Sequence, residues 1–148
     1  MKVVVGSDHA GYELKEHLKS LLQQWGHEVI DMGTHSAESV DYPRFGVAVG
    51  EEVVELEADG EVRGLCVCGT GIGISIAANK VLGVRAAVAY ETTGARLARQ
   101  HNNANILCLG ARLIGPEVAA DTLKMFLESG FEGGRHARRV DQLNALGQ

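Results

Sequence analysis

The feature that most constrains this chain is a glycine-rich stretch at its centre. Residues 65–68 are a short apolar run typical of a buried strand, and glycines follow at positions 69, 71 and 73. The segment 74–80 then has a composition compatible with a helix. A strand, a glycine loop and a helix in this order turn backbone N–H groups toward an anion, and the helix N-terminus adds partial positive charge. The stretch therefore predicts a loop that binds a phosphate or another oxyanion.

Strands and helices alternate along the whole chain. The patterns predict strands at residues 3–6, 28–32, 65–68, 83–89 and 105–109. They predict helices between residues 9 and 26, over 45–58, after the glycine loop, over 92–101, from 116 to about 129, and near the end of the chain. This alternation predicts an α/β fold: a three-layer Rossmann-like sandwich, with a five-stranded parallel sheet in the order 2-1-3-4-5 and helices on both faces. Residues 1–148 then form a single domain, with a tail and last helix from about residue 130.

The expected topology also predicts where a ligand binds. In open parallel sheets ligands bind at the carboxyl ends of the strands, at the point where the strand order reverses. In the order 2-1-3-4-5 that point lies between the first and third strands. These two strands end in Asp8-His9 and in Cys68-Gly69-Thr70. The polar residues are therefore expected to meet where the topology places a ligand.

Charge, length and cysteine content exclude several classes of protein. The net charge of −5 gives no reason to expect nucleic acid or an anionic membrane as a partner, so a local basic cluster must attract any anionic ligand. No segment approaches the roughly 18 apolar residues of a membrane span, and Met1–Gly6 is a strand rather than a signal peptide. The three cysteines, Cys66, Cys68 and Cys108, lie in apolar runs, which favours reduced thiols in a cytoplasmic protein. Cys66-x-Cys68 has no histidine at ligand spacing, so no metal site is expected.

The glycine spacing is not that of a dinucleotide fingerprint. Counted from Gly69 or from Gly71, the third glycine position of the pattern G-x-G-x-x-G is occupied by Ile74 or Ile76. Glu91 does fall about 20 residues further on, where such a fold carries its acidic residue, so the acidic residue alone does not exclude this interpretation. The spacing favours a different phosphate ligand.

Cys68 is a candidate base or nucleophile. A free cysteine is more often a packed core residue, and we interpret Cys66 and Cys108 in that way. Cys68 differs because it stands at the end of its strand, against the glycine loop. A helix N-terminus lowers the pKa of a nearby thiol from about 8.5, so a useful fraction of thiolate near neutral pH is expected there.

The remaining polar candidates each have a structural alternative. Asp8 could only cap the first helix. His101 could be no more than a helix end, where an imidazole interacts well with the dipole. Arg135 and Arg139 stand four residues apart and share one helix face. Such a pair is usually a solvated surface, but after two glycines and in an acidic chain it could also be a phosphate clamp.

Five sequence blocks together resemble the type-B ribose-5-phosphate isomerases, which form one superfamily with the galactose-6-phosphate isomerase subunits. The match runs from Met1 to about Asn144, and the blocks occur in the family's order. No single block would suffice, but the set is highly specific. The blocks are Asp8–Gly11, Asp41–Pro43, Cys68–Lys80, Arg99–Asn102 and Glu132–His136.

The resemblance implies a role for each of the matching residues. Cys68 would be the base that moves a proton between carbons 1 and 2 of the open-chain sugar, and His101 would open the furanose ring. The loop would hold a cis-enediolate, with Thr70 and Asp8 assisting catalysis. Its members are Gly69, Thr70, Gly71, Ile72 and Gly73. The residues that would bind substrate, the arginines chiefly through phosphate, are Asp8, His9, Asn102, Arg112, Arg135 and Arg139. Some members carry a loop Glu as base, where this chain has Ile74, so it resembles the Cys type.

The resemblance therefore implies an isomerase that interconverts D-ribose 5-phosphate and D-ribulose 5-phosphate in the non-oxidative pentose phosphate pathway. Aldose–ketose exchange needs a base over two adjacent carbons and donors where the enediolate charge develops. It needs no metal or organic cofactor when the backbone supplies the donors. One alternative is the same chemistry on a four- or six-carbon aldose phosphate, such as allose 6-phosphate or galactose 6-phosphate. Another is a non-catalytic sugar-phosphate or nucleotide sensor, although a sensor needs neither Cys68 nor His101.

The predicted strand order creates a problem that a dimer would solve. Arg112 follows the fifth strand, at the far edge, and His101 and Asn102 lie just before that strand. A monomer would struggle to bring these residues to the Asp8–Cys68 crevice. The resemblance implies a site at a two-fold interface, with the His, the Asn and the following Arg supplied by the partner. We therefore expect an obligate homodimer with two shared sites, which could pair into a tetramer. The alternative is a monomer in which Arg112 is an ordinary surface charge.

Overall fold

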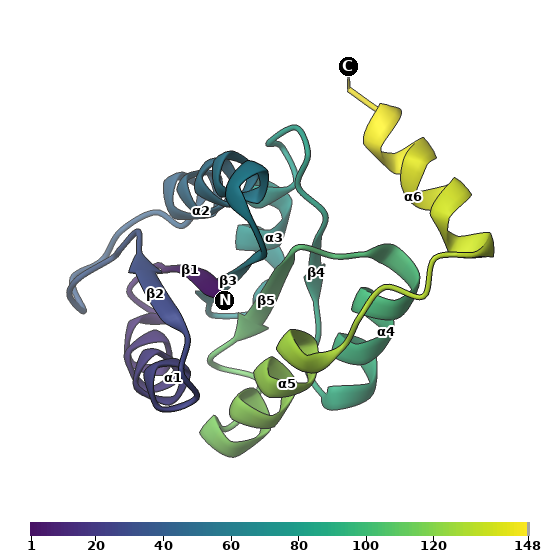
Figure 1. Cartoon of the computed structure of the whole chain (residues 1–148). Coiled ribbons are helices and arrows are strands. Elements are labelled where there is room, and N and C mark those ends of the chain that lie inside the picture. Colours follow the sequence, from purple (N-terminus) through teal and green to yellow (C-terminus); the bar gives the residue numbers. More distant parts are fainter. Residues whose placement is uncertain (148) are drawn as a thin grey trace.

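The protein is a five-stranded parallel sheet with helices packed on both faces (Figure 1), as seen in a computed structural model that describes residues 1–147. The strands lie in the order β2-β1-β3-β5-β4. In chain order the elements are β1 (Lys2–Ser7), α1 (Tyr12–Gln24), β2 (Glu28–Asp31), α2 (Pro43–Leu56), the 3-10 helix η1 (Glu57–Asp59), β3 (Val62–Cys68), α3 (Ile72–Ala78), β4 (Ala86–Val88), α4 (Thr92–Asn102), β5 (Ile106–Gly110), α5 (Pro116–Glu128) and α6 (Arg135–Ala145).

Alternate residues of each central strand supply two separate cores. Val3 and Val5 of β1 pack on one face of the sheet, against the apolar sides of α1, α4 and α5. Val4, between them, packs on the other face, against α2 and α3. Side chains on a strand alternate between its faces, so a strand between two helical layers must be apolar at every position. The predicted α/β sandwich is therefore confirmed.

The predicted order of the last two strands is wrong. Residues Gly64–Cys68 of β3 pair with Ile106–Gly110 of β5, and β4 lies outside β5 at the edge of the sheet. The physical reason is burial. All five residues of β5 are buried, whereas β4 has three residues, each only half-buried. A long apolar run suits the middle of a parallel sheet and a short strand suits its edge. The order still reverses between β1 and β3, as expected.

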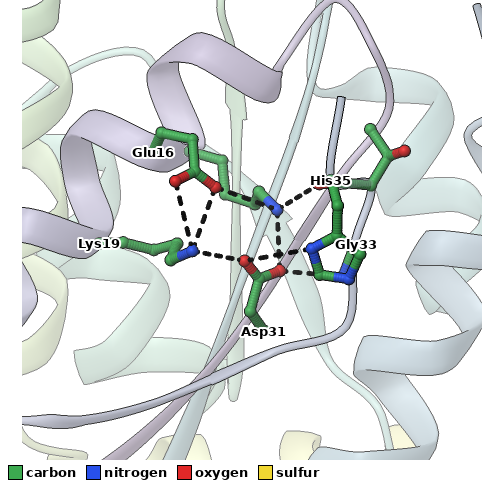
Figure 2. A network of polar contacts seen from close by, with 7 residues as sticks. Glu16, Lys19, Asp31, Gly33 and His35 are labelled. Atoms are coloured by element: carbon green, nitrogen blue, oxygen red, sulfur yellow. Dashed lines mark hydrogen bonds and ion pairs between the residues drawn. The ribbon is translucent and has the colours of Figure 1, made fainter. Parts of the chain in front are cut away.

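A network of polar contacts around Asp31 braces the segment that follows β2 (Figure 2). Lys15 of α1 is fully buried, and its Nζ donates to Asp31 Oδ1 at 2.8 Å and to the carbonyl of Thr34 at 2.6 Å. Lys19 donates to the other Asp31 oxygen at 2.7 Å. Burial alone would raise the pKa of Asp31, but the hydrogen bonds from the two lysines and from the Gly33 N–H hold it below its ordinary value. Asp31 is therefore a charged anchor at neutral pH.

This brace reaches the end of β1. The Ser7 N–H donates to the Gly33 carbonyl, and the Thr34 N–H donates to the Ser7 carbonyl, each at 2.7 Å. Ser7 is the residue immediately before Asp8. The network around Lys15 therefore fixes the strand end from which Asp8 and His9 project.

Helix α6 stands apart from the rest of the molecule and packs beside the end of α4 (Figure 1). A groove of about 580 Å³ lies between the end of α6 and the loop that connects α3 to β4. Apolar side chains from both sides line it: Val81, Leu82, Val84, Leu143 and Leu146. None of the helices in residues 1–147 is both long and apolar enough to cross a membrane.

Candidate active site

Asp8 and Cys68 lie at the ends of neighbouring strands. Ser7 of β1 is paired with Val67 of β3, and the Asp8 N–H donates to the Val67 carbonyl at 3.3 Å. Both Asp8 and Cys68 are buried, at 7% and 4% exposed. The structure thus brings together the two polar strand ends at the carboxyl edge of the sheet, where parallel sheets bind their ligands.

The sulfur of Cys68 accepts a hydrogen bond from the loop that follows it. The Gly71 N–H donates to Cys68 Sγ at 3.1 Å. This contact fixes the sulfur against the backbone of the glycine loop. Behind it, a hydrogen bond with Cys66, together with burial, raises the pKa of the Cys108 thiol well above its ordinary value. Cys66 and Cys108 are fully buried core residues, which leaves Cys68 as the thiol at the site.

The glycine loop presents its backbone to the same site. Gly71 has a φ of +80°, a conformation that glycine adopts without strain, and it leads into α3 at Ile72. The first N–H groups of a helix have no carbonyl partner within the helix, and the Ile72 N–H donates to Thr70 Oγ1 at 3.2 Å. Ile74 is fully buried in the core beneath the loop. The loop can therefore offer N–H groups to a negatively charged oxygen next to the Cys68 sulfur.

Asp8 and His9 are each held by backbone groups. Asp8 Oδ1 accepts from the Gly11 N–H at 3.1 Å and so closes the turn before α1, but the N-cap residue of that helix is Gly11 and no side chain caps it. Only one of its carboxylate oxygens is used in that bond. His9 Nδ1 lies 3.2 Å from both the backbone N and O of Val40, so the loop before α2 fixes the imidazole. Both side chains are preoriented at the strand end.

Arg112 also lies at this edge, which corrects the expectation that it is remote. Because β5 neighbours β3, the Arg112 N–H donates to the Gly69 carbonyl at 3.0 Å. The guanidinium lies over the glycine, since a Cβ built on Gly69 would be 3.3 Å from Arg112 Nη1. A single chain therefore brings this cation to the Cys68 loop, and the argument for a dimer from Arg112 fails.

The other expected residues lie at the amino ends of the strands, which we call the amino edge of the sheet, opposite the carboxyl edge. Helix α4 runs back across the sheet and ends at Asn102, just before β5 begins. His101, in its last turn, stacks on His136 of α6, with ring centroids 4.2 Å apart and planes 10° from parallel. Arg135 and Arg139 are exposed on α6. The chain thus separates His101, Asn102 and the two arginines from Cys68.

The histidine pair belongs to a cluster of side chains with metal-ligand atoms. Within residues 1–147, ligand atoms of His101, Glu132 and His136 lie within 4.8 Å of one another. Parallel stacked rings direct their in-plane nitrogen lone pairs side by side rather than toward one point, so a ring would have to turn before both could bind one ion. Desolvation, together with the neighbouring His101 and Arg135, lowers the pKa of His136, which keeps its ring neutral at pH 7.

Two tyrosines that the sequence analysis did not assign also reach the loop. The ring of Tyr42 lies against Gly73, where a Cβ would come within 2.6 Å of the ring carbons. Tyr90, after β4, donates its hydroxyl to the Thr70 carbonyl at 2.7 Å. Tyr42 lies in the Asp41–Pro43 block of the family resemblance, so the sequence did contain an indication that it is near the site. Nothing in the sequence near Tyr90 indicated its contact.

Comparisons with known proteins identify the relatives of this chain and of its fold. Residues 3–143 match the family model described as "Ribose/Galactose Isomerase". The chain is 45% identical over 147 residues to the ribose-5-phosphate isomerase B of Escherichia coli. The aligned region covers 99% of this chain and 97% of that protein. A ribose-5-phosphate isomerase B structure from Clostridium thermocellum superposes with a TM-score of 0.93 at 53% identity, covering 97% and 95% of the two chains. That from Mycoplasma genitalium with bound ribulose-5-phosphate superposes at 0.91 with 38% identity, covering 97% and 93%.

Proposed function

This chain belongs to the ribose/galactose isomerase family, and we propose that it interconverts D-ribose 5-phosphate and D-ribulose 5-phosphate. The observation that carries the proposal is the Cys68 sulfur, bonded to the Gly71 N–H beside Asp8 at the carboxyl edge of the sheet. A relative of the same fold was solved with ribulose-5-phosphate bound. The reaction is a step of the non-oxidative pentose phosphate pathway, and free buried thiols fit a reducing compartment such as the cytoplasm.

The proposed chemistry is a proton transfer between two carbons. The Cys68 thiolate removes the proton from carbon 2 of the open-chain aldose, and the electron pair moves to give a cis-enediolate. Return of the proton to carbon 1, with proton exchange between the two oxygens, gives the ketose. The developing oxygen charge is stabilised by N–H groups at the start of α3, next to the Gly71 N–H that donates to the sulfur, and Thr70 and Asp8 assist with the hydroxyl protons. These groups provide the base, the oxyanion donors and the proton exchange that the reaction needs, without a metal or organic cofactor.

We further propose a homodimer in which each site combines both edges of the sheet. Ring opening needs His101 within reach of the same sugar as Cys68, yet in one chain they lie at opposite edges. In the dimer, His101 and Asn102 come from the partner, and Arg135 and Arg139 bind the phosphate together with Arg112. Exposed apolar side chains on α3 and in the connection that follows it support such an interface: Ile72, Ile76 and Leu82 are each at least half exposed. The groove beside α6 continues this apolar surface.

The experiment that tests the function is an isomerisation assay of the purified protein with a panel of sugar phosphates. The panel contains four-, five- and six-carbon aldose phosphates, including allose 6-phosphate and galactose 6-phosphate. Ribose 5-phosphate is expected to have the highest kcat/KM. A higher value for another sugar would keep the chemistry and change the substrate. Binding of the sugars without turnover would favour the sensor.

A further inference from the structure

We infer that Tyr90 is a positioning residue for Cys68, a role that rests on the proposed function. Its hydroxyl holds the peptide group between Thr70 and Gly71 in the orientation whose N–H donates to the Cys68 sulfur. Two hydrogen bonds carry this inference. Tyr90 Oη donates to the Thr70 carbonyl at 2.7 Å, and the Gly71 N–H donates to Cys68 Sγ at 3.1 Å.

The two bonds belong to opposite sides of one peptide group, because the Thr70 carbonyl and the Gly71 N–H share the same amide. A donor on the carbonyl oxygen polarises the amide and strengthens the bond made by its N–H. The Tyr90 hydroxyl, the amide and the sulfur are therefore coupled through two consecutive hydrogen bonds. Withdrawal of the hydroxyl weakens the donor that stabilises the thiolate.

This amide also needs a restraint on its orientation. Gly71, at a φ of +80°, has no Cβ to oppose a rotation of the amide, so the peptide can turn over at low cost. In the reversed orientation the Thr70 oxygen would face the sulfur and repel both the thiolate and an enediolate. The Tyr90 bond is made only when the oxygen points away from Cys68.

The space for that oxygen is provided by the neighbouring strand. A Cβ on Gly110, the last residue of β5, would lie 2.5 Å from the Thr70 oxygen. Because β5 ends in a glycine, the Thr70 carbonyl can lie across it and meet Tyr90, which follows the edge strand β4. In the observed order β3-β5-β4, Tyr90 follows the edge strand β4 and reaches across the end of β5 to the loop that follows β3.

Other groups around the sulfur are unchanged by removal of the Tyr90 hydroxyl. They lie on the strands beside Cys68 or against the glycine loop: Asp8 after β1, Cys66 on β3, Cys108 on β5, Arg112 against Gly69, and Tyr42 against Gly73. A change in the ionisation behaviour of Cys68 in Tyr90→Phe therefore reports on the amide. The ring itself stays in place, since the substitution removes a single oxygen.

The test compares Tyr90→Phe with Tyr12→Phe, a matched control on α1. Tyr90→Phe is expected to lower kcat by roughly 3- to 10-fold, the scale of one neutral hydrogen bond, with KM within about twofold. The pH midpoint of Cys68 alkylation by iodoacetamide, assigned by peptide mass, is expected to move upward by a few tenths of a unit. Tyr12→Phe leaves all three values unchanged, and thermal unfolding shows whether each variant is folded.

An unchanged alkylation midpoint in Tyr90→Phe overturns the inference, even if kcat falls, because the tyrosine would then be a structural residue only. Equal shifts in the two tyrosine variants overturn it as well. The alkylation readout does not need turnover. If the wild-type protein isomerises no sugar phosphate while the midpoint still shifts, the proposed function fails and the coupling of Tyr90 to Cys68 stands.

Discussion

The two edges of the sheet differ in how they hold their polar residues. At the carboxyl edge, Cys68 and Asp8 are buried and bonded to backbone groups of short loops between packed elements. At the amino edge, His101 and the arginines lie on the last turn of α4 and on α6, which packs only at the side of the molecule (Figure 1). The reactive group is thus preorganised within one chain, whereas the cationic groups are presented outward.

This difference indicates how the work is divided. A base must be placed to within a fraction of an ångström and shielded from water, which rigid buried positions achieve. A phosphate can be held by exposed guanidinium groups, since their charge acts over a longer range. An edge that presents Arg135, Arg138 and Arg139 in an acidic protein is suited to complete a site on a second copy of the chain.

The largest effect is expected from removal of the base at the carboxyl edge. Cys68→Ala should lower kcat by roughly 10²–10⁴-fold in both directions, the usual scale for a lost general base, while substrate still binds. Steady-state kinetics and calorimetric binding measure the two quantities. Cys66→Ala, two residues earlier on the same strand, is the matched control and should remain active, as should Cys108→Ala. Equal losses in the Cys66 and Cys68 variants would contradict the assignment of roles.

Removal of the imidazole at the amino edge is expected to act on one direction of the reaction. His101→Ala should lower turnover of cyclic ribose 5-phosphate by roughly 10²-fold, because ring opening loses its acid–base group. Ribulose 5-phosphate has no furanose ring to open, so its turnover should fall much less. Rapid mixing with each substrate separates the two directions. Similar losses in both would assign His101 to binding or folding.

A mixture of the two inactive variants tests whether the edges meet in a dimer. A heterodimer of Cys68→Ala and His101→Ala subunits has one site with both lesions and one with neither. Random re-pairing should therefore restore activity toward a quarter of the wild-type value. Subunit exchange is followed with differently tagged chains. Exchange without recovery of activity would show that each chain builds its own site.

The sequence predicted the carboxyl edge better than the amino edge. Periodic apolar residues and the glycine loop are local signals, so the sandwich and the meeting of Asp8 with Cys68 could be predicted. The fully apolar run Ile106–Leu109 could have indicated that β5 is a central strand and β4 an edge strand. The lengths of the connections alone do not distinguish the two possible strand orders. The stacking of His101 on His136 and the bond from Tyr90 join segments far apart in the chain, and no local pattern encodes them.

The smallest effect on turnover is expected from the brace under the carboxyl edge (Figure 2). Asp31→Asn removes the nearer charged partner of the fully buried Lys15 ammonium and leaves only the more exposed Glu16 carboxylate, 3.6 Å away. Breaking such a pair destabilises a protein by about 3 kcal/mol, whereas kcat should fall by less than about threefold because the Thr34 and Ser7 backbone bonds remain. Urea unfolding at fixed protein concentration gives the first value, and kinetics gives the second.

The same variant should remove an acid sensitivity of the wild-type protein. The pKa of Asp31 lies below its unfolded value of 3.8 in the folded protein, so its stabilisation is fully present above that value and is lost as the pH falls below it. Wild-type stability should therefore drop between about pH 4 and pH 2 more steeply than that of Asp31→Asn. Asp59→Asn, on the exposed turn η1, is the matched control and should follow the wild-type curve. Parallel curves for all three proteins would mean that ionisation of Asp31 contributes nothing to the stability of the folded protein.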